Sequence, residues 1–205
     1  MSDISDVALA ISVPFADPNW RAMVLQYGLA SERSSLSISR VFVAASRSVV
    51  LCPGVAAASL QAVLHYSAGM LRIWILVLFL IGSSFLLALP SLLALALVCS
   101  LIASSVVVHE LGHVISFRLI ASPHAHALLV SRGINCSLIR ETLPWRMDRL
   151  EILSGPLAPL LLTVPLVPIV LVAPILFWAW LSIALGHALF LIVPIGDGEN
   201  LRATR

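Results

Sequence analysis

The sequence predicts an all-α polytopic membrane protein with about four transmembrane helices and a short β-like cytoplasmic loop between the second and the third. Sixty per cent of its 205 residues are hydrophobic and 11% are charged, a composition far from that of a soluble globular domain. Two long apolar blocks, residues 71–108 and 155–196, are separated by a polar stretch. These observations indicate an integral membrane protein.

The first apolar block is too long for one crossing of a bilayer. As a single straight helix, residues 71–108 would extend about 57 Å, whereas the hydrocarbon core is about 30 Å thick. Proline lacks a helix donor and biases the preceding residue away from helix, so Pro90 marks the natural reversal. We therefore expect a first span at about 72–89 and a second span from about residue 92.

The second apolar block has the same arithmetic, because as one helix it would extend roughly 63 Å. Pro174 and a group of aromatic residues that follows it lie near the middle of this block. A reversal there predicts two further spans, at about 156–174 and 178–195.

The polar stretch between the two blocks, residues 121–152, predicts a loop outside the bilayer. Within it, the apolar segments 127–130 and 134–139 flank Ser131-Arg132-Gly133, a pattern typical of a β-hairpin. An ordinary connector is the alternative interpretation of this loop.

Charge is distributed unevenly around the expected spans. All twelve basic residues are arginines, and they lie outside the two apolar blocks except for Arg72 at the start of the first block; the two short reversals carry no charge. The positive-inside rule then places the middle loop and both termini in the cytoplasm, for a multi-pass protein of the prokaryotic plasma (inner) membrane. No basic cluster is interleaved with aromatic residues, so nucleic acid is not an expected partner. The apolar composition makes the lipid bilayer the expected partner.

The chain divides into two expected regions. Residues 1–70 are mixed in character and are interpreted as an N-terminal cytoplasmic or membrane-associated extension, and residues 71–205 as the transmembrane core. The moderately apolar segment 41–64 predicts short strands or an amphipathic helix, with an extra membrane-associated segment as the alternative.

A His-Glu-Leu-Gly-His pentapeptide at 109–113 ends the first apolar block. On a helix, positions i and i+4 lie one above the other, so His109 and His113 can offer two imidazoles to one metal ion with Glu110 beside it. His109 lies about 26 Å along the second span, which predicts a site inside the membrane near its cytoplasmic face. This spacing is typical of zinc hydrolases.

A catalytic zinc site usually has three protein ligands, so a third ligand is required. Asp197 is the best candidate, because it follows the fourth span and glycines on both sides permit a tight turn toward the metal. Glu199 is the competing carboxylate, and a helix-capping role in water is the alternative for Asp197. The three cysteines are scattered with no CxxC pair, so a thiolate site is not indicated.

Three sequence landmarks in this order resemble the site-2 protease family of intramembrane zinc metalloproteases. They are the pentapeptide at 109–113, Ser-Gly-Pro-Leu-Ala at 154–158, and Pro-Ile-Gly-Asp-Gly at 194–198. The resemblance covers about residues 92–200, roughly half of the chain. The chain departs from the family pattern at Pro159 and Leu191, where the family has asparagine, so it resembles a divergent member.

The resemblance implies Zn²⁺ as the cofactor, with His109, His113 and Asp197 as ligands and Glu110 as the catalytic base. It also implies an intramembrane zinc metalloendopeptidase that hydrolyses peptide bonds in or near transmembrane segments of membrane protein or peptide substrates. One alternative is a non-catalytic membrane subunit of a peptide-processing or export system that retains a metal site. A zinc protease acting on soluble peptides at the cytoplasmic surface is another.

Three further histidines require separate interpretation. His124 and His126 could share one strand face and bind a second metal, although surface histidines are favoured. His187 lies about 15 Å along the expected fourth span from Asp197, too far to share the zinc, so a hydrogen-bonded residue of the helix bundle is favoured over a gating role.

Overall fold

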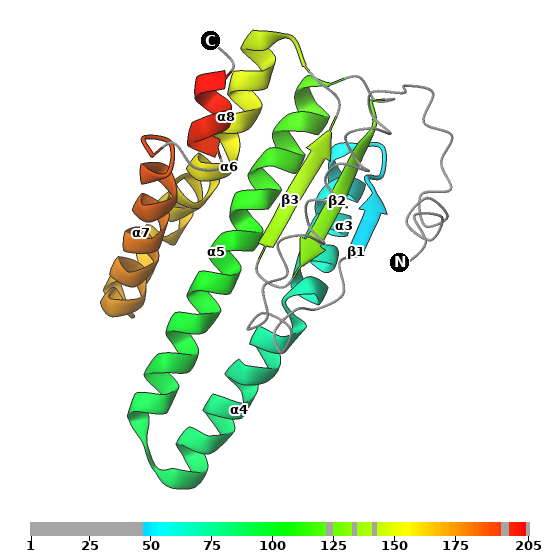
Figure 1. Ribbon diagram of the computed structural model, residues 1–205. Helices are drawn as coiled ribbons and strands as arrows, with labels where there is room; N and C mark the ends of the chain where they lie inside the picture. Colours follow the sequence, from blue (N-terminus) through cyan, green and yellow to red (C-terminus); the bar gives the residue numbers. More distant parts are fainter. Residues whose placement is uncertain (1–46, 122–124, 133–134, 141–142, 194–196, 204–205) are drawn as a thin grey trace. The chain divides into compact units, whose positions relative to one another are not determined.

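The structure is a computed structural model that describes residues 47–121, 125–132, 135–140, 143–193 and 197–203, all of which belong to one compact unit, Ala44–Arg205 (Figure 1). The elements in chain order are β1 (Arg47–Val50), α3 (Val55–Gly69), α4 (Leu71–Leu87), α5 (Pro90–Ile120), β2 (Ala127–Arg132), β3 (Asn135–Arg140), α6 (Trp145–Leu166), the 3-10 helix η2 (Val167–Leu171), α7 (Pro174–Leu189) and α8 (Asp197–Ala203).

The predicted reversal at Pro90 is confirmed. Helix α4 ends at Leu87, Ala88 adopts a left-handed conformation with φ of 51°, and Pro90 occupies the first turn of α5. The Ser84 hydroxyl donates a hydrogen bond of 2.9 Å to the Leu89 carbonyl and closes the turn. Figure 1 shows α4 and α5 running side by side from this turn.

Two of the described helical segments are long and apolar enough to cross a membrane: α5, and α6 together with η2. Helices α3 and α4 pass the same test as a pair, but they are bent by 65° where they join, so they form at most one broken span. Helix α7 is apolar but has only 16 residues. The structure therefore contains two or three candidate spans, and the count of four stays a prediction.

The boundaries of α6 and α7 differ from the expected spans. Helix α6 begins at Trp145, so residues 145–152, expected in the middle loop, are helical. Two acidic residues of this segment, Asp148 and Glu151, form ion pairs with Arg140 of β3, as in the 2.7 Å contact between Asp148 Oδ1 and Arg140 Nη1. Helix α7 ends at Leu189 and is followed by turns, not by helix to residue 195.

The predicted hairpin is present as β2 and β3. These strands pair antiparallel in the register Ala127 with Arg140 and Arg132 with Asn135. Strand β1 pairs antiparallel with β2 on its other side, which gives a three-stranded sheet in the order β1-β2-β3. The sheet thus combines the expected hairpin with a strand from the N-terminal part of the chain.

The main core lies between the sheet, α3 and α5. Tyr66 of α3, Phe117 of α5 and Leu129 of β2 are all fully buried in it. The Tyr66 hydroxyl also donates a hydrogen bond of 3.2 Å to the Ser137 carbonyl of β3. On the other side, α5 contacts α6 and α7 (Figure 1). Helix α5 is therefore the common support of the sheet and of the later helices.

Arg118 fastens the last turn of α5 to the sheet. Its Nη1 donates a hydrogen bond of 2.9 Å to the Ala125 carbonyl, and its Nη2 donates one of 2.8 Å to the Leu51 carbonyl. These acceptors lie next to β2 and β1, so one guanidinium holds two strands at the end of one helix.

Replacing Arg118 by Met should lower the free energy of unfolding in detergent by about 3 kcal/mol, because each hydrogen bond from a charged donor contributes about 1.5–3 kcal/mol. The matched control is Arg146→Met, since Arg146 is exposed and its guanidinium contacts only the Trp145 ring among the interactions described, which is worth less than about 1 kcal/mol. Equal losses in denaturant titrations of the two variants would contradict the role of Arg118.

Candidate metal site

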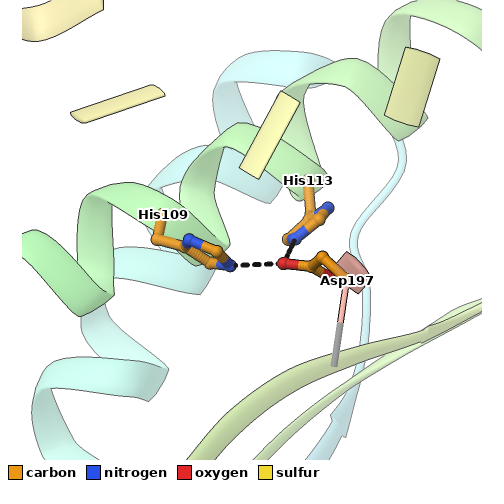
Figure 2. A group of neighbouring side chains, drawn as sticks. All are labelled: His109, His113 and Asp197. Carbon is orange, nitrogen blue, oxygen red and sulfur yellow. Dashed lines mark ion pairs between the residues drawn. The ribbon is translucent and has the colours of Figure 1, made fainter. Parts of the chain in front are cut away.

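Helix α5 places His109 and His113 on one face, one turn apart. Their ring centroids are 5.1 Å apart and the ring planes are inclined by 70°. His113 is buried and His109 is half-buried. Figure 2 shows both rings directed toward the same point beside the helix. The arrangement expected from the i, i+4 spacing is therefore present.

Asp197, the first residue of α8, reaches both imidazoles. Its Oδ2 lies 3.0 Å from His109 Nε2 and 3.5 Å from His113 Nε2 (Figure 2). The candidate ligand atoms of the three residues all lie within 4.8 Å of one another, the one such group in the described part of the chain. Glu199 is exposed and lies outside this group. The structure thus unites the three side chains that the sequence selects.

The position of Asp197 depends on the glycine that follows it. A Cβ atom at Gly198 would collide with the carbonyl oxygens of Val193 and Phe190, so only glycine allows α8 to begin this close to the turns after α7. Arg202 Nη2 donates a hydrogen bond of 2.7 Å to the Ile192 carbonyl and holds α8 in that position. Burial opposes ionisation of Asp197, but hydrogen bonds from His109 and His113 lower its pKa well below the usual range.

Glu110 is buried beside these ligands, with 8% of its surface exposed. Its charge interacts with those of His113 and Asp197, and its Oε2 has no hydrogen-bond partner among the described residues. An unpartnered buried carboxylate oxygen costs free energy, so its retention suggests a function. The side chain is available to bind a proton or a polar ligand.

Two glycines allow α5 and α6 to approach closely at the site. A Cβ atom at Gly112 would lie 2.7 Å from Ala158 Cβ and would collide with the Ser154 carbonyl, and one at Gly155 would collide with the His113 ring. Ser154 Oγ donates a hydrogen bond of 3.0 Å to the Gly112 carbonyl across the same contact. The first landmark, residues 109–113 of α5, and the second, residues 154–158 of α6, thus pack against each other.

The far side of the His113 ring is held by Glu151 of α6. His113 Nδ1 lies 3.0 Å from the Glu151 carbonyl oxygen and 3.2 Å from its Oε1. Both atoms are acceptors, so Nδ1 carries a proton, and Nε2 would be the atom that binds a metal ion. The sequence reasoning missed Glu151, although its position three residues before Ser154 puts it on the same face of a helix extended toward the N-terminus.

His187 lies against His109 instead of outside the site. Their ring centroids are 4.9 Å apart, and His187 Nε2 is 3.1 Å from Ser105 Oγ, which itself donates to the Ile102 carbonyl. The expected hydrogen bond within the helix bundle is therefore present, although His187 packs against a candidate ligand, because α7 already ends at Leu189. His187 is nevertheless not one of the three converging ligands.

Of the two histidines expected to share a strand face, His126 lies just before β2, and His124 lies outside the described residues.

Comparisons with known proteins add no family to this geometry. A scan against protein-family models, a search of curated proteins and a search of solved structures each found no match. The resemblance to site-2 proteases therefore rests on the three landmarks and on the way the chain brings them together.

The donor set suits a divalent metal ion. Two imidazole nitrogens and one carboxylate oxygen match the ligands of catalytic zinc sites, which keep a further position open. The unpartnered Glu110 oxygen next to them fits a site in which a polar ligand is bound and activated. The three residues could thus hold a metal ion, whose identity the geometry leaves open.

Replacing Asp197 by Ala should abolish stoichiometric metal binding in the purified protein, because two imidazoles alone rarely form a catalytic-type site. Glu199→Ala is the matched control, since Glu199 is exposed on the same helix and should leave metal content unchanged. Elemental analysis after dialysis measures both. Loss of metal in the Glu199 variant, with metal retained in the Asp197 variant, would reverse the assignment.

Gly155→Ala should also abolish or strongly weaken metal binding, because the added methyl occupies the space of the His113 ring. Gly186→Ala, in α7, is the matched control, since a Cβ atom there meets no atom within 4 Å. Calorimetric titration with zinc measures the two affinities. Equal affinities would show that the ring does not depend on the close helix contact.

Proposed function

We propose that the protein is an intramembrane zinc metalloendopeptidase that cleaves membrane-spanning protein or peptide substrates. The observation that carries the proposal is the convergence of His109, His113 and Asp197 on one point, with the unpartnered carboxylate oxygen of Glu110 beside it. Each of the three landmarks that resemble site-2 proteases supplies a residue at this arrangement: His109 and His113 from the first, Gly155 from the second and Asp197 from the third.

The chemistry follows from the donor set and from Glu110. A zinc ion bound by the three ligands would act as a Lewis acid toward the scissile carbonyl and would acidify a bound water. Glu110 accepts the proton of the attacking water on its carboxylate and delivers it to the leaving amine.

The length of α5 supports a site at membrane depth. The helix has 31 residues and is therefore about 46 Å long, more than the hydrocarbon core of about 30 Å. His109 lies about 29 Å from the Pro90 end, at the level where such a helix reaches the opposite interface. Arg118 and the sheet follow at that end, in agreement with a cytoplasmic side.

The proposal includes four crossings with both termini in the cytoplasm. Large apolar side chains remain exposed on α4 and α7, among them Phe79, Phe85, Ile175 and Trp178. Exposed apolar surface of this extent on both helices is suited to contact with lipid. Helix α7, although short, would then cross together with the turns at residues 190–193 that follow it.

Strand β3 is suited to receive the substrate. A transmembrane helix must unwind before hydrolysis, because its carbonyls are engaged in helix hydrogen bonds. Strand β3 is one of the two outer strands of the described sheet, and it contacts α5. Burial and, to a smaller extent, the charge of Glu110 raise the pKa of the Cys136 thiol in this strand to about 12, which fits a strand that passes near the base. An extended substrate added to this edge would run near Glu110.

The unpartnered carboxylate oxygen of Glu110 favours an enzyme over a non-catalytic subunit. A purely structural metal site needs its ligands and their supporting hydrogen bonds, but it does not need a buried carboxylate oxygen without a partner. Glu110 Oε2 is such an atom, and Glu110 directly follows the candidate ligand His109 in the sequence.

Replacing Glu110 by Gln should leave metal content unchanged while lowering the rate of cleavage by about 10²–10⁴-fold, because the amide cannot take the water proton. The assay combines elemental analysis with mass spectrometry of a panel of membrane peptides incubated with the protein in liposomes. Glu199→Gln is the control that should keep full activity.

Metal bound with no cleavage of any peptide by the unaltered protein would favour the membrane-subunit alternative. Cleavage sites mapped outside every apolar segment would instead favour a protease for soluble peptides.

A further inference from the structure

The ion-pair chain between the β-hairpin and the metal site is unused by the proposed mechanism. Arg140 at the end of β3 pairs through Nη2 with Glu151 Oε2, and through Nη1 with Asp148 Oδ1 at 2.7 Å. Glu151 Oε1 in turn lies 3.2 Å from His113 Nδ1. The Glu151 carboxylate thus contacts Arg140 with one oxygen and the His113 imidazole with the other.

A buried ion pair often has no role beyond satisfying its own charges. Two features set Glu151 apart from such a pair. With 3% of its surface exposed, it is more deeply buried than an ordinary surface partner of arginine, and it reaches the one nitrogen of His113 that faces away from the metal ligands. Asp148, by contrast, pairs with the same arginine, and no contact with His113 is described for it.

We propose that Glu151 is a positioning residue for the metal ligand His113, held in place by Arg140. The inference rests on the metal site of the proposed function. Ligating histidines generally donate their second ring N–H to a carboxylate or carbonyl, which sets the tautomer and strengthens the ligand. Here the Glu151 carbonyl fixes the proton on Nδ1, and the carboxylate adds negative charge that increases electron donation from Nε2.

The position of Arg140 extends this role to the hairpin. Arg140 is the last residue of β3, and its guanidinium fixes the Glu151 carboxylate from the side opposite His113. The strand that we propose as the substrate edge is therefore joined to a metal ligand through two side chains. Displacement of the end of β3 would change the hydrogen bond on His113.

The test measures metal affinity and metal geometry in the full-length protein in detergent, using Co²⁺ as a spectroscopic probe. Glu151→Ala should weaken Co²⁺ binding about tenfold, at the low end of the usual 10–100-fold loss, because the backbone carbonyl still holds the Nδ1 proton. The visible absorption bands of its Co²⁺ complex should shift, because the His113 ring loses its contact with the carboxylate. Asp148→Asn, the matched control, should change affinity by less than about threefold and leave the bands in place.

Two further variants separate positioning from folding. Glu151→Gln keeps an acceptor oxygen of the same reach, so it should bind Co²⁺ more tightly than Glu151→Ala but less tightly than the unaltered protein. Arg140→Gln should shift the Co²⁺ bands in the same direction as Glu151→Ala. Thermal unfolding of the metal-free proteins shows whether each variant is folded.

The outcomes distinguish this inference from the proposed function. Unchanged Co²⁺ affinity and absorption bands in folded Glu151→Ala and Glu151→Gln would overturn the positioning role while leaving the metal site intact. Failure of the unaltered protein to bind Co²⁺ or Zn²⁺ would overturn the metal site, and this inference with it.

Discussion

The close contact between α5 and α6 at Gly112 and Gly155 is the constraint on which the site depends. A side chain at either glycine would overlap the opposite helix, and at Gly155 it would overlap the His113 ring itself. Because the contact is this tight, α6 can hold the far nitrogen of His113 while its near nitrogen faces Asp197. The position of the candidate ligand His113 therefore depends directly on how closely α5 and α6 pack.

The site gathers ionisable groups in a mainly apolar helical structure, where unpaired charge is costly. Two of the acids have charged or hydrogen-bonding partners: Asp197 has the two imidazoles, and Glu151 has Arg140 and His113. Within the described part of the chain, two buried atoms of the site lack a hydrogen bond, namely Nδ1 of His109 and Oε2 of Glu110. Proteins depart from full satisfaction of buried polar groups mainly at functional sites, and Glu110 is the proposed base.

Much of the fold and part of the site follow from local sequence rules. The reversal at Pro90 and the hairpin around Ser131-Arg132-Gly133 depend on short-range backbone preferences, and the histidine pair depends on helix periodicity. The contacts of Glu151 depend on a helix that begins at Trp145, and the charged residues around this position suggested a loop; in the structure Glu151 forms an ion pair with Arg140 of β3. The place of His187 beside His109 depends on where α7 ends, which apolar composition alone does not specify.

The central claim is that His109, His113 and Asp197 bind one metal ion. X-ray absorption spectroscopy of the zinc-loaded protein tests this claim most directly, because it reports the number and type of the atoms bound to zinc. The account predicts two imidazole nitrogens together with oxygen ligands, at about 2.0–2.2 Å. A sulfur ligand at about 2.3 Å, or a spectrum unchanged when Asp197 is replaced by Ala, would contradict it.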